Sequence, residues 1–191
     1  MASCRQLKKG AVAPCEPGVA GLKAKTVLVR KEDIAGFVRD AVIKKGIVLT
    51  LVAGKKGFLF QGLGDSNAAR AELVPGKYKP SYKHEFDLVA FDPGPEQAET
   101  MEDLAGDAEG VISITLDNNG YYKVLGLNGG LRPSAMKTDS ADADLGGGIP
   151  ATLSSDKEVG LADYLMVITD GVYDAAATKL AFEALYAAPV V

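Results

Sequence analysis

The chain has 191 residues, of which 47% are hydrophobic and 24% charged, and a formal net charge of −4 at pH 7, values typical of one globular domain that buries its own core. The weak negative charge argues against a dedicated nucleic-acid binder, because such proteins carry a clustered basic face. The sequence has neither the run of about 20 apolar residues that a membrane-spanning helix needs nor the apolar segment of a signal peptide near its start, so we expect synthesis in the cytoplasm and no membrane partner.

The first 24 residues form an arm that contains glycine and proline, and we expect a single domain over 25–191. Cys4 and Cys15 are the only cysteines in the chain, and His84 is the only histidine. These residues do not supply the four ligands of a structural zinc site. A disulfide between the two cysteines is geometrically possible, but a reducing cytoplasm disfavours it, and we expect two buried free thiols.

The first half of the domain contains short apolar runs that alternate with polar turns. A helix is expected over 34–43, because its apolar side chains recur at the i, i+3, i+4 and i+7 positions of a helical face. One strand is expected on each side of the turn Gly54-Lys55-Lys56-Gly57, whose lysines keep the turn in contact with water. The expected elements are a strand over 25–31, a short helix over 34–43, two strands within 46–61 and a short helix over 67–74.

The second half carries the clearest pattern of the chain, a β-hairpin over 111–126. Its two apolar runs flank Asn118-Asn119-Gly120, and Asn-Gly favours the positive φ values of tight hairpin turns. Strict alternation over 82–91 predicts a strand with His84 on its inward face. The expected elements are a strand over 82–91, a helix over 95–108, the hairpin, a loop over 127–148, strands over 149–153 and 164–168, and a helix within the last twenty residues.

This order of elements indicates an α+β fold, mostly an antiparallel two-sheet β sandwich or barrel-like fold with one central helix and a C-terminal helix. No internal repeat and no low-complexity linker divides the chain.

Three sets of residues invite a chemical interpretation. The glycine clusters at 62–64, 126–130 and 146–148 lack the lysine, hydroxyl and following helix of a phosphate loop, so we interpret them as turns. Asp139, Asp142 and Asp144 do not have the spacing of a calcium loop, and we expect a solvated loop. His84 has no second histidine or neighbouring cysteine, and we expect a hydrogen-bonded structural residue. A pair of carboxylates for glycoside chemistry stays an open alternative, because such residues come together in space and need not be close in the sequence. We expect no enzyme activity, no cofactor and no metal.

Four segments carry a resemblance to a known family: the arm SCRQLKKGAVAPCEPGVAG, the block FDLVAF…PEQAETMEDLAG, the hairpin DNNGYYKVLGLNGGL and the strand GGGIPATLSS. With these in this order, the chain resembles bacteriophage major tail (tail-tube) proteins, and in particular those of phages and prophages of Bacteroidetes. The resemblance implies a two-sheet β fold with a flanking helix, in a virion subunit that forms rings stacked as a tube for DNA passage.

Several expectations follow from the resemblance. The partners would be further copies of the chain and other tail proteins, with DNA passing but not specifically bound, and the location would be the phage tail after synthesis in the host cytoplasm. We expect subunit contacts at the two exposed turns, with residues Gly54, Lys55, Lys56, Gly57, Asn118 and Asn119. The alternatives are a neck, baseplate or capsid-associated subunit, or a soluble binding module.

Overall fold

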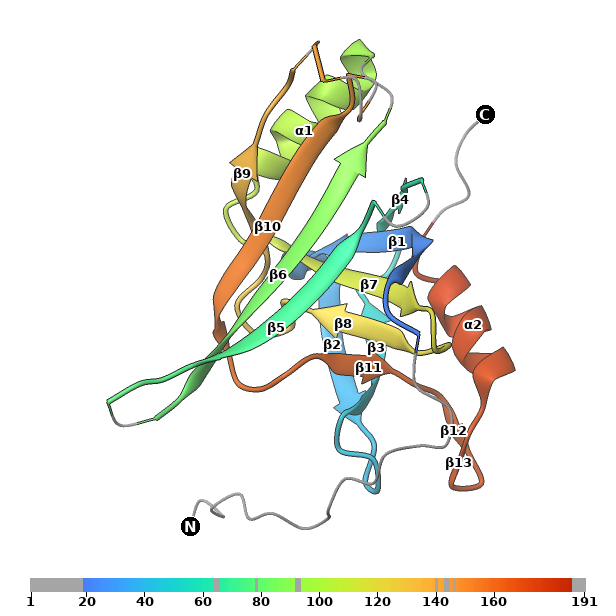
Figure 1. Cartoon of the computed structure of the whole chain (residues 1–191). Coiled ribbons are helices and arrows are strands. Elements are labelled where there is room, and N and C mark those ends of the chain that lie inside the picture. Colours follow the sequence, from blue (N-terminus) through green and yellow to red (C-terminus); the bar gives the residue numbers. More distant parts are fainter. Residues whose placement is uncertain are drawn as a thin grey trace.

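The computed structural model of the protein describes residues 19–63, 66–77, 79–91, 94–139, 141–142, 145 and 147–186. In this part of the chain the strands form a seven-stranded sheet, a four-stranded sheet and a small two-stranded ribbon, accompanied by two α-helices and a 3₁₀ turn over Lys31–Asp33 (Figure 1). Cys4, Cys15 and Asp144 lie outside the described residues.

The seven-stranded sheet has the order β2-β3-β11-β8-β7-β1-β4. Its only parallel neighbours are β3 and β11, and the other pairs are antiparallel. Its strands are β1 Leu22–Arg30, β2 Ile34–Arg39, β3 Gly46–Leu51, β4 Phe58–Gln61, β7 Val111–Asp117, β8 Tyr122–Leu125 and β11 Asp163–Leu165.

The four-stranded sheet has the order β5-β6-β10-β9 and is antiparallel throughout. Its strands are β5 Ala68–Val74, β6 Ser81–Ala90, β9 Arg132–Met136 and β10 Ile149–Glu158. The remaining elements are the helices α1 Pro95–Gly106 and α2 Ala175–Glu183, and the ribbon of β12 Ile168–Thr169 and β13 Val172–Tyr173.

The seven-stranded sheet separates two hydrophobic cores. Because successive side chains of a strand point to opposite faces, β1 supplies Leu28 to the first core and Val27 to the second. In the first core Leu28 packs with Phe86 of the four-stranded sheet and Met101 of α1. The second core lies on the other face, where Phe182 of α2 joins residues of the sheet. Both faces of the larger sheet are therefore covered.

The most regular sequence patterns predict their elements correctly. The strands over 25–31 and 82–91, the hairpin over 111–126 and both helices are confirmed. In the hairpin turn Gly120 has φ +85°, and the Asp117 carboxylate accepts hydrogen bonds from the backbone N–H groups of Asn119 and Tyr121. The helix α2 begins after Asp174, whose carboxylate accepts the N–H of Ala177 at 2.9 Å, as an N-cap residue does.

The helix expected over 34–43 is wrong, because Ile34–Arg39 is the edge strand β2. It pairs with β3 in an antiparallel register that places Phe37 opposite Leu49 and Val38 opposite Val48. The helical spacing was misleading because the apolar side chains of β2 are not confined to a buried face. Val38 is 70% exposed.

The short helix expected over 67–74 is also wrong. Ala68–Val74 is strand β5, and each of its residues is in register with a residue of β6, from Ala68 opposite Asp87 to Val74 opposite Ser81. Alanine, arginine, glutamate and leucine favour helices, but pairing with a long neighbouring strand outweighs a local preference of a few tenths of a kcal/mol per residue.

The loop expected over 127–148 contains strand β9. The sequence did not predict this strand, because a proline within a run argues against a strand. Pro133 is tolerated because β9 is an edge strand, where a missing N–H breaks no ladder. Strand β10 continues to Glu158, beyond the expected end at Leu153, and the strand expected over 164–168 is divided between β11 and β12.

The fold is α+β and mostly antiparallel, but its sheets are open, so the barrel-like alternative is wrong. The two strands predicted within 46–61 exist, but β3 and β4 do not pair with each other and lie at different places in the sheet. The turn between them therefore joins two separated strands of the sheet and does not close a hairpin.

We predict that Gly57→Ala destabilises the protein by about 1–3 kcal/mol, the usual cost of overpacking a core. A Cβ at this position would lie 2.7 Å from Val27 Cγ1, 2.8 Å from Val29 Cγ2 and 3.0 Å from the Leu28 carbonyl oxygen. Urea unfolding measures the change. Gly36→Ala is the matched control, since a Cβ there meets no atom within 4 Å, and equal stabilities of the two variants would contradict the packing of Gly57.

Candidate functional site

The hairpin of β2 and β3 carries exposed apolar side chains at one edge of the seven-stranded sheet. Isolated exposed apolar residues are ordinary, whereas several of them on one hairpin mark a candidate interaction surface. Val38 and Val48 are paired and share one face of the hairpin, while Phe37 points to the other face. We call this group the β2–β3 patch. Its members are Phe37 (40% exposed), Val38 (70%), Val42 (82%), Ile43 (38%), Val48 (41%) and Val52 (40%).

The tip of the patch has a defined backbone. The carboxylate of Asp40 accepts hydrogen bonds from the N–H groups of Val42 at 2.8 Å and Ile43 at 2.6 Å, an arrangement in which an aspartate orders a turn. Val42 and Ile43 are thereby held at the end of the hairpin. A surface that is ordered before binding loses less conformational entropy when a partner docks.

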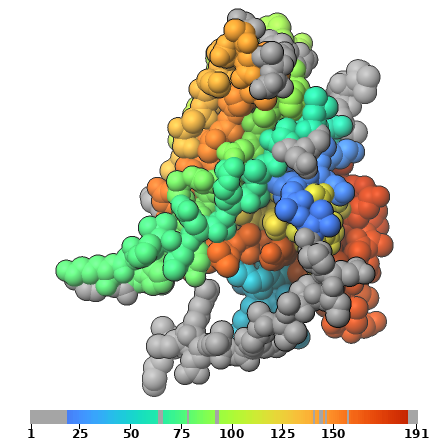
Figure 2. All heavy atoms as spheres, viewed as in Figure 1, coloured from blue at the N-terminus to red at the C-terminus, as the bar shows by residue number. Residues whose placement is uncertain are grey.

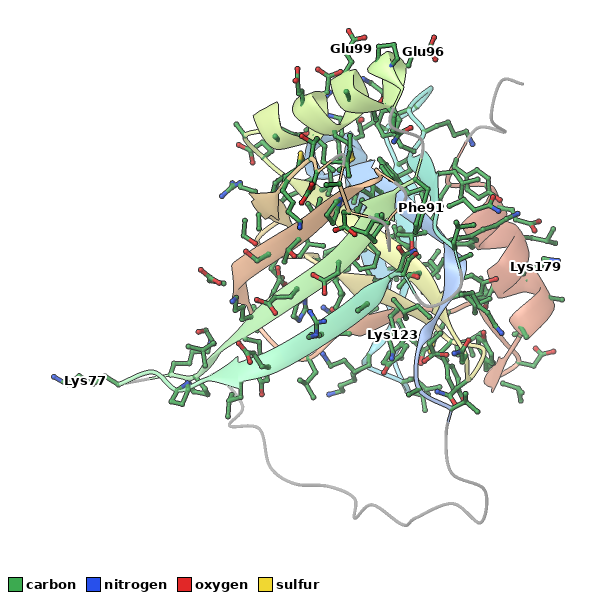
Figure 3. All side chains as sticks on the ribbon, turned by 45° about the horizontal axis from the view of Figure 1, so that its top comes forward. Lys77, Phe91, Glu96, Glu99, Lys123 and Lys179 are labelled. Carbon is green, nitrogen blue, oxygen red and sulfur yellow. The ribbon has the colours of Figure 1, made fainter. Side chains whose placement is uncertain are left out.

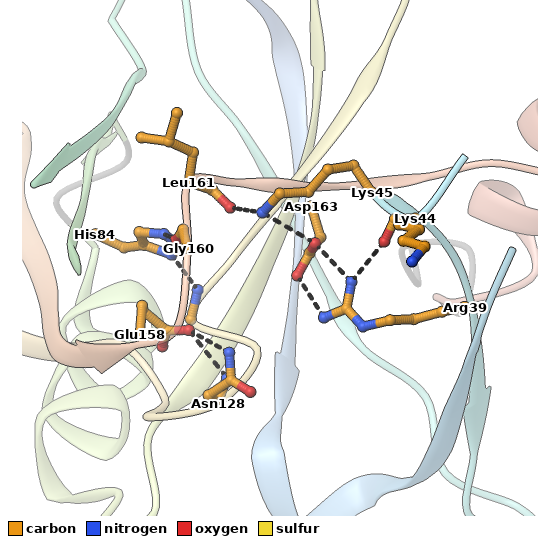
Figure 4. A network of polar contacts seen from close by, with 10 residues as sticks. Arg39, Lys44, Lys45, His84, Asn128, Glu158, Gly160, Leu161 and Asp163 are labelled. Carbon is orange, nitrogen blue, oxygen red and sulfur yellow. Dashed lines mark hydrogen bonds and ion pairs between the residues drawn. The ribbon is translucent and has the colours of Figure 1, made fainter. Parts of the chain in front are cut away.

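An ion-pair cluster fixes the turn end of this hairpin to β11 (Figure 4). Asp163 is buried and accepts two hydrogen bonds from the guanidinium of Arg39, at 2.8 and 3.0 Å, while Lys45 Nζ lies 3.3 Å from its carboxylate. The hydrogen bond to Asp163 raises the pKa of Arg39. The bidentate geometry orients β2 relative to the sheet.

Glu158 is a buried carboxylate that holds the loop following β8. It accepts the backbone N–H groups of Asn128 and Gly129, the Asn128 side-chain amide and the Ser155 hydroxyl, at 2.8–3.1 Å. Figure 4 shows its contacts with Asn128. Burial acts to raise the pKa of Glu158, but these hydrogen bonds outweigh it and the pKa lies below its ordinary value. Glu158 is therefore an ionised structural anchor, with both oxygens occupied.

His84 is a hydrogen-bonded structural residue, as its position in the strand predicts. It is 2% exposed, its Nε2 lies 2.9 Å from the Gly160 carbonyl, and its Nδ1 lies 3.1 Å from the Gly126 nitrogen. The neutral ring with the proton on Nε2 satisfies both contacts. Protonation of Nδ1 would place its hydrogen against the Gly126 N–H, and burial also lowers the pKa of His84.

The other residues considered for chemistry lie in structural roles where the structure describes them. The carboxylate of Asp139 accepts the N–H of Ala141, and that of Asp142 accepts the N–H of Leu145. Gly126, Gly130 and Gly147 have positive φ values, as turn glycines do. Within the described ranges, no three His, Cys, Asp or Glu residues are grouped to hold a metal, and no helix has the length and apolar character to cross a bilayer.

The expected subunit-contact residues occupy two turns with contacts inside the molecule. Gly54 is exposed, whereas Lys55 lies 3.3 Å from Asp33 and Lys56 hydrogen-bonds the Ala184 carbonyl. Gly57 is buried and donates its N–H to the Leu185 carbonyl. Gly54, Lys55 and Lys56 keep exposed surface, and contact between subunits at this turn stays a prediction.

The side chains of Asn118 and Asn119 hold the start of the described chain. Asn118 donates to the Ala20 carbonyl at 2.7 Å, and Asn119 exchanges two hydrogen bonds with the backbone of Val19. This turn therefore anchors Val19 and Ala20, which precede β1. Whether it also meets a neighbouring subunit stays a prediction.

The hairpin of β5 and β6 extends from the body of the protein (Figures 1 and 2). Its outer part carries Leu73, 55% exposed, and Val74, 36% exposed, and Lys77 lies near its end (Figure 3). A two-stranded ribbon is only marginally stable when it has no further layer against it. Its apolar outer part is therefore a second candidate contact.

The sequence-based interpretation missed the β2–β3 patch because the assumed helix would have buried Ile34, Phe37 and Val38 in the core. The available signals were Asp40 and the run Lys44-Lys45-Gly46, which lie between two short segments rich in β-branched residues, as the turn residues of a hairpin do.

Comparison of the chain with protein-family models, curated proteins and solved structures gave no match. The resemblance to tail proteins therefore rests on the sequence segments that suggested it.

We predict that stability falls by up to about 1.4 kcal/mol per pH unit below pH 6.5 because of His84. Its pKa is lower in the folded protein than in the unfolded chain, so the unfolded chain binds more protons there. The stability is complete above the unfolded pKa and is lost as the pH falls through it. Urea unfolding between pH 5 and 8 measures this slope.

NMR titration of the single imidazole provides an independent value, which we expect below 6.5. The control is His84→Gln, which cannot titrate and should lose the His84 part of the slope even if it is less stable throughout. An imidazole that titrates at or above 6.5 would contradict the buried neutral ring.

Proposed function

We propose that this chain is a structural subunit that assembles with copies of itself into rings, which stack as the tube of a phage tail. The β2–β3 patch is the observation that carries the proposal. It is an ordered apolar surface on an open sheet edge, in a protein whose buried His84, Glu158 and Asp163 are engaged in structural hydrogen bonds.

The two candidate contacts lie on different sheets, so a contact between them would join unlike surfaces. The patch lies at the β2 end of the seven-stranded sheet, whereas the β5–β6 hairpin belongs to the other sheet. When one surface of a subunit meets a different surface of the next, repetition of the contact generates a closed ring or an open filament. The resemblance to tail-tube proteins selects the ring, and the two open sheets that share a core agree with the sandwich it implies.

The outer face of the four-stranded sheet supports a role in DNA passage without DNA binding. Arg70 pairs with Asp87 at 2.5 Å and Lys83 pairs with Glu85 at 2.6 Å, so these two basic side chains are neutralised by carboxylates on the same sheet. Tight binding to DNA depends on lysine and arginine that replace counterions along the backbone. A surface of paired charges does not provide them, and a passage lined by it would let DNA slide.

Sedimentation velocity and negative-stain electron microscopy of the purified full-length protein test the proposal. We expect closed rings or stacked rings above a threshold concentration. A protein that stays monomeric at millimolar concentration and over a range of salt would overturn it and would favour the soluble binding module.

We predict that the double variant Val38→Asp/Val42→Asp loses assembly and keeps its fold. Burial of these two side chains would contribute about 3 kcal/mol per contact, so the variant should assemble at least a hundredfold more weakly. Sedimentation velocity measures assembly, and thermal unfolding measures the fold. The control is Val172→Asp/Leu180→Asp, with wild-type exposures of 69% and 67% away from the patch. Equal loss of assembly in both variants would count against the patch.

A further inference from the structure

Strand β4 presents an open hydrogen-bonding edge. Among the described strands it pairs with β1, where Leu28 is opposite Phe58 and Thr26 is opposite Phe60. On its other side the preceding residue, Gly57, bridges to Tyr186, and the open part of the edge begins after it. Gly62 donates its N–H to the Ala24 carbonyl of β1, and because backbone groups alternate in direction along a strand, those of Leu59 and Gln61 point away from β1. Within the described part of the chain they have no partner strand, so this edge can accept an extended segment.

A groove runs along this edge between β4 and α1. Its two parts, of about 540 and 610 Å³, both include Phe58, Phe60 and Thr100 in their walls. Leu28 and Leu104 line the first part together with Phe58, which is 53% exposed. The groove therefore combines an apolar floor with unpaired backbone groups on one side.

The opposite wall of the groove is acidic. Helix α1 contains four acidic residues and no basic one, and Glu96 and Glu99 mark it in Figure 3. Glu102 and Asp103 line the groove and are exposed, and neither forms an ion pair with another described residue. The one cation in that part of the lining, Arg30, is engaged by Asp107 at 2.9 Å and Glu32 at 2.7 Å. An occupant should therefore be extended, apolar over a few residues, and basic.

We propose that the groove binds the N-terminal arm, residues 1–18, of a second copy of this chain. The arm has three basic residues, Arg5, Lys8 and Lys9, against one acidic residue. Lys8 and Lys9 meet Glu102 and Asp103, and the following Ala11-Val12-Ala13 adds a strand along β4. Alanine and valine side chains are small enough to lie over Phe58 and Phe60. The inference deepens the proposed self-assembly and rests on it for the source of the arm.

The anchoring of the arm favours a second copy over the same chain. Val19 is held by Asn119, at the start of β1, whereas the acidic part of the groove lies beside Arg30 at its end. Nine residues of strand cover about 30 Å. The ten residues from Lys9 to Val19 span at most about 36 Å when fully extended. To reach the acidic part of the groove, the arm of the same chain would have to run back along all of β1 in a fully extended conformation.

Two full-length charge-reversal variants test the proposal. Variant A is Lys8→Glu/Lys9→Glu, and variant B is Glu102→Lys/Asp103→Lys. Each variant alone places like charges in arm and groove, and we expect its assembly to weaken at least tenfold. In an equimolar mixture every A arm meets a B groove and every B arm meets an A groove with opposite charges. We expect the mixture to recover wild-type assembly.

The mixture distinguishes docking between copies from docking within one chain, because arms that fold back on their own chain gain nothing from mixing. Absence of recovery would therefore overturn the proposal. Assembly of either variant alone at the wild-type concentration would also overturn it, while leaving self-assembly itself intact. Matched thermal unfolding of both variants and wild type serves as the folding control.

A binding measurement tests the groove independently of assembly. A fluorescent synthetic peptide of residues 1–18 is titrated into full-length variant A, whose own arm is repelled, and into variant B. We expect saturable binding to A that weakens as salt is raised, and at least tenfold weaker binding to B. Equal binding to both variants, or no binding to A, would overturn the proposal even if the wild-type protein forms rings.

Discussion

The arrangement of this protein depends on a seven-stranded sheet that is buried on both faces. Strand β1 divides its side chains between two cores, with Leu28 facing the four-stranded sheet and α1, and Val27 facing α2. With most of both faces covered, the edges of the sheet are its main surfaces for contact with another molecule. Those edges, β2 and β4, are also where exposed apolar side chains gather, including Val38 and Phe58. The function we propose follows from this constraint, because open edges promote association between chains.

Buried polar residues keep those edges in defined positions. Asp163 joins β2 to β11 through Arg39, Glu158 joins the loop after β8 to β10, and His84 joins β6 to the turns at Gly126 and Gly160. Each group has hydrogen-bonding partners inside the fold, which is the condition under which buried polar residues orient a structure at tolerable cost. These three groups therefore orient the elements that they join.

The sequence predicted the elements whose signal is local. The alternation around His84, the Asn118-Asn119-Gly120 turn and the proline-led start of α1 each depend on neighbouring residues, and the structure confirms all three. It could not predict β2 and β5, because their residues have helical spacing or helical propensity and become strands only through pairing with β3 and β6. The error at β2 also concealed the patch, since a helix would have buried Phe37. Pairing between distant segments is what a single sequence does not display.

The most direct test of the central claim is hydrogen–deuterium exchange, compared between the dispersed and the assembled full-length protein. If the open edges are the contact surfaces, peptides that cover β2 with its turn and β4 should exchange more slowly after assembly. Peptides of α2, which packs on the sheet in the second core, should keep their exchange rate. Unchanged exchange at both edges in an assembled sample, with protection only over α2 or the β12–β13 ribbon, would contradict an edge-directed assembly.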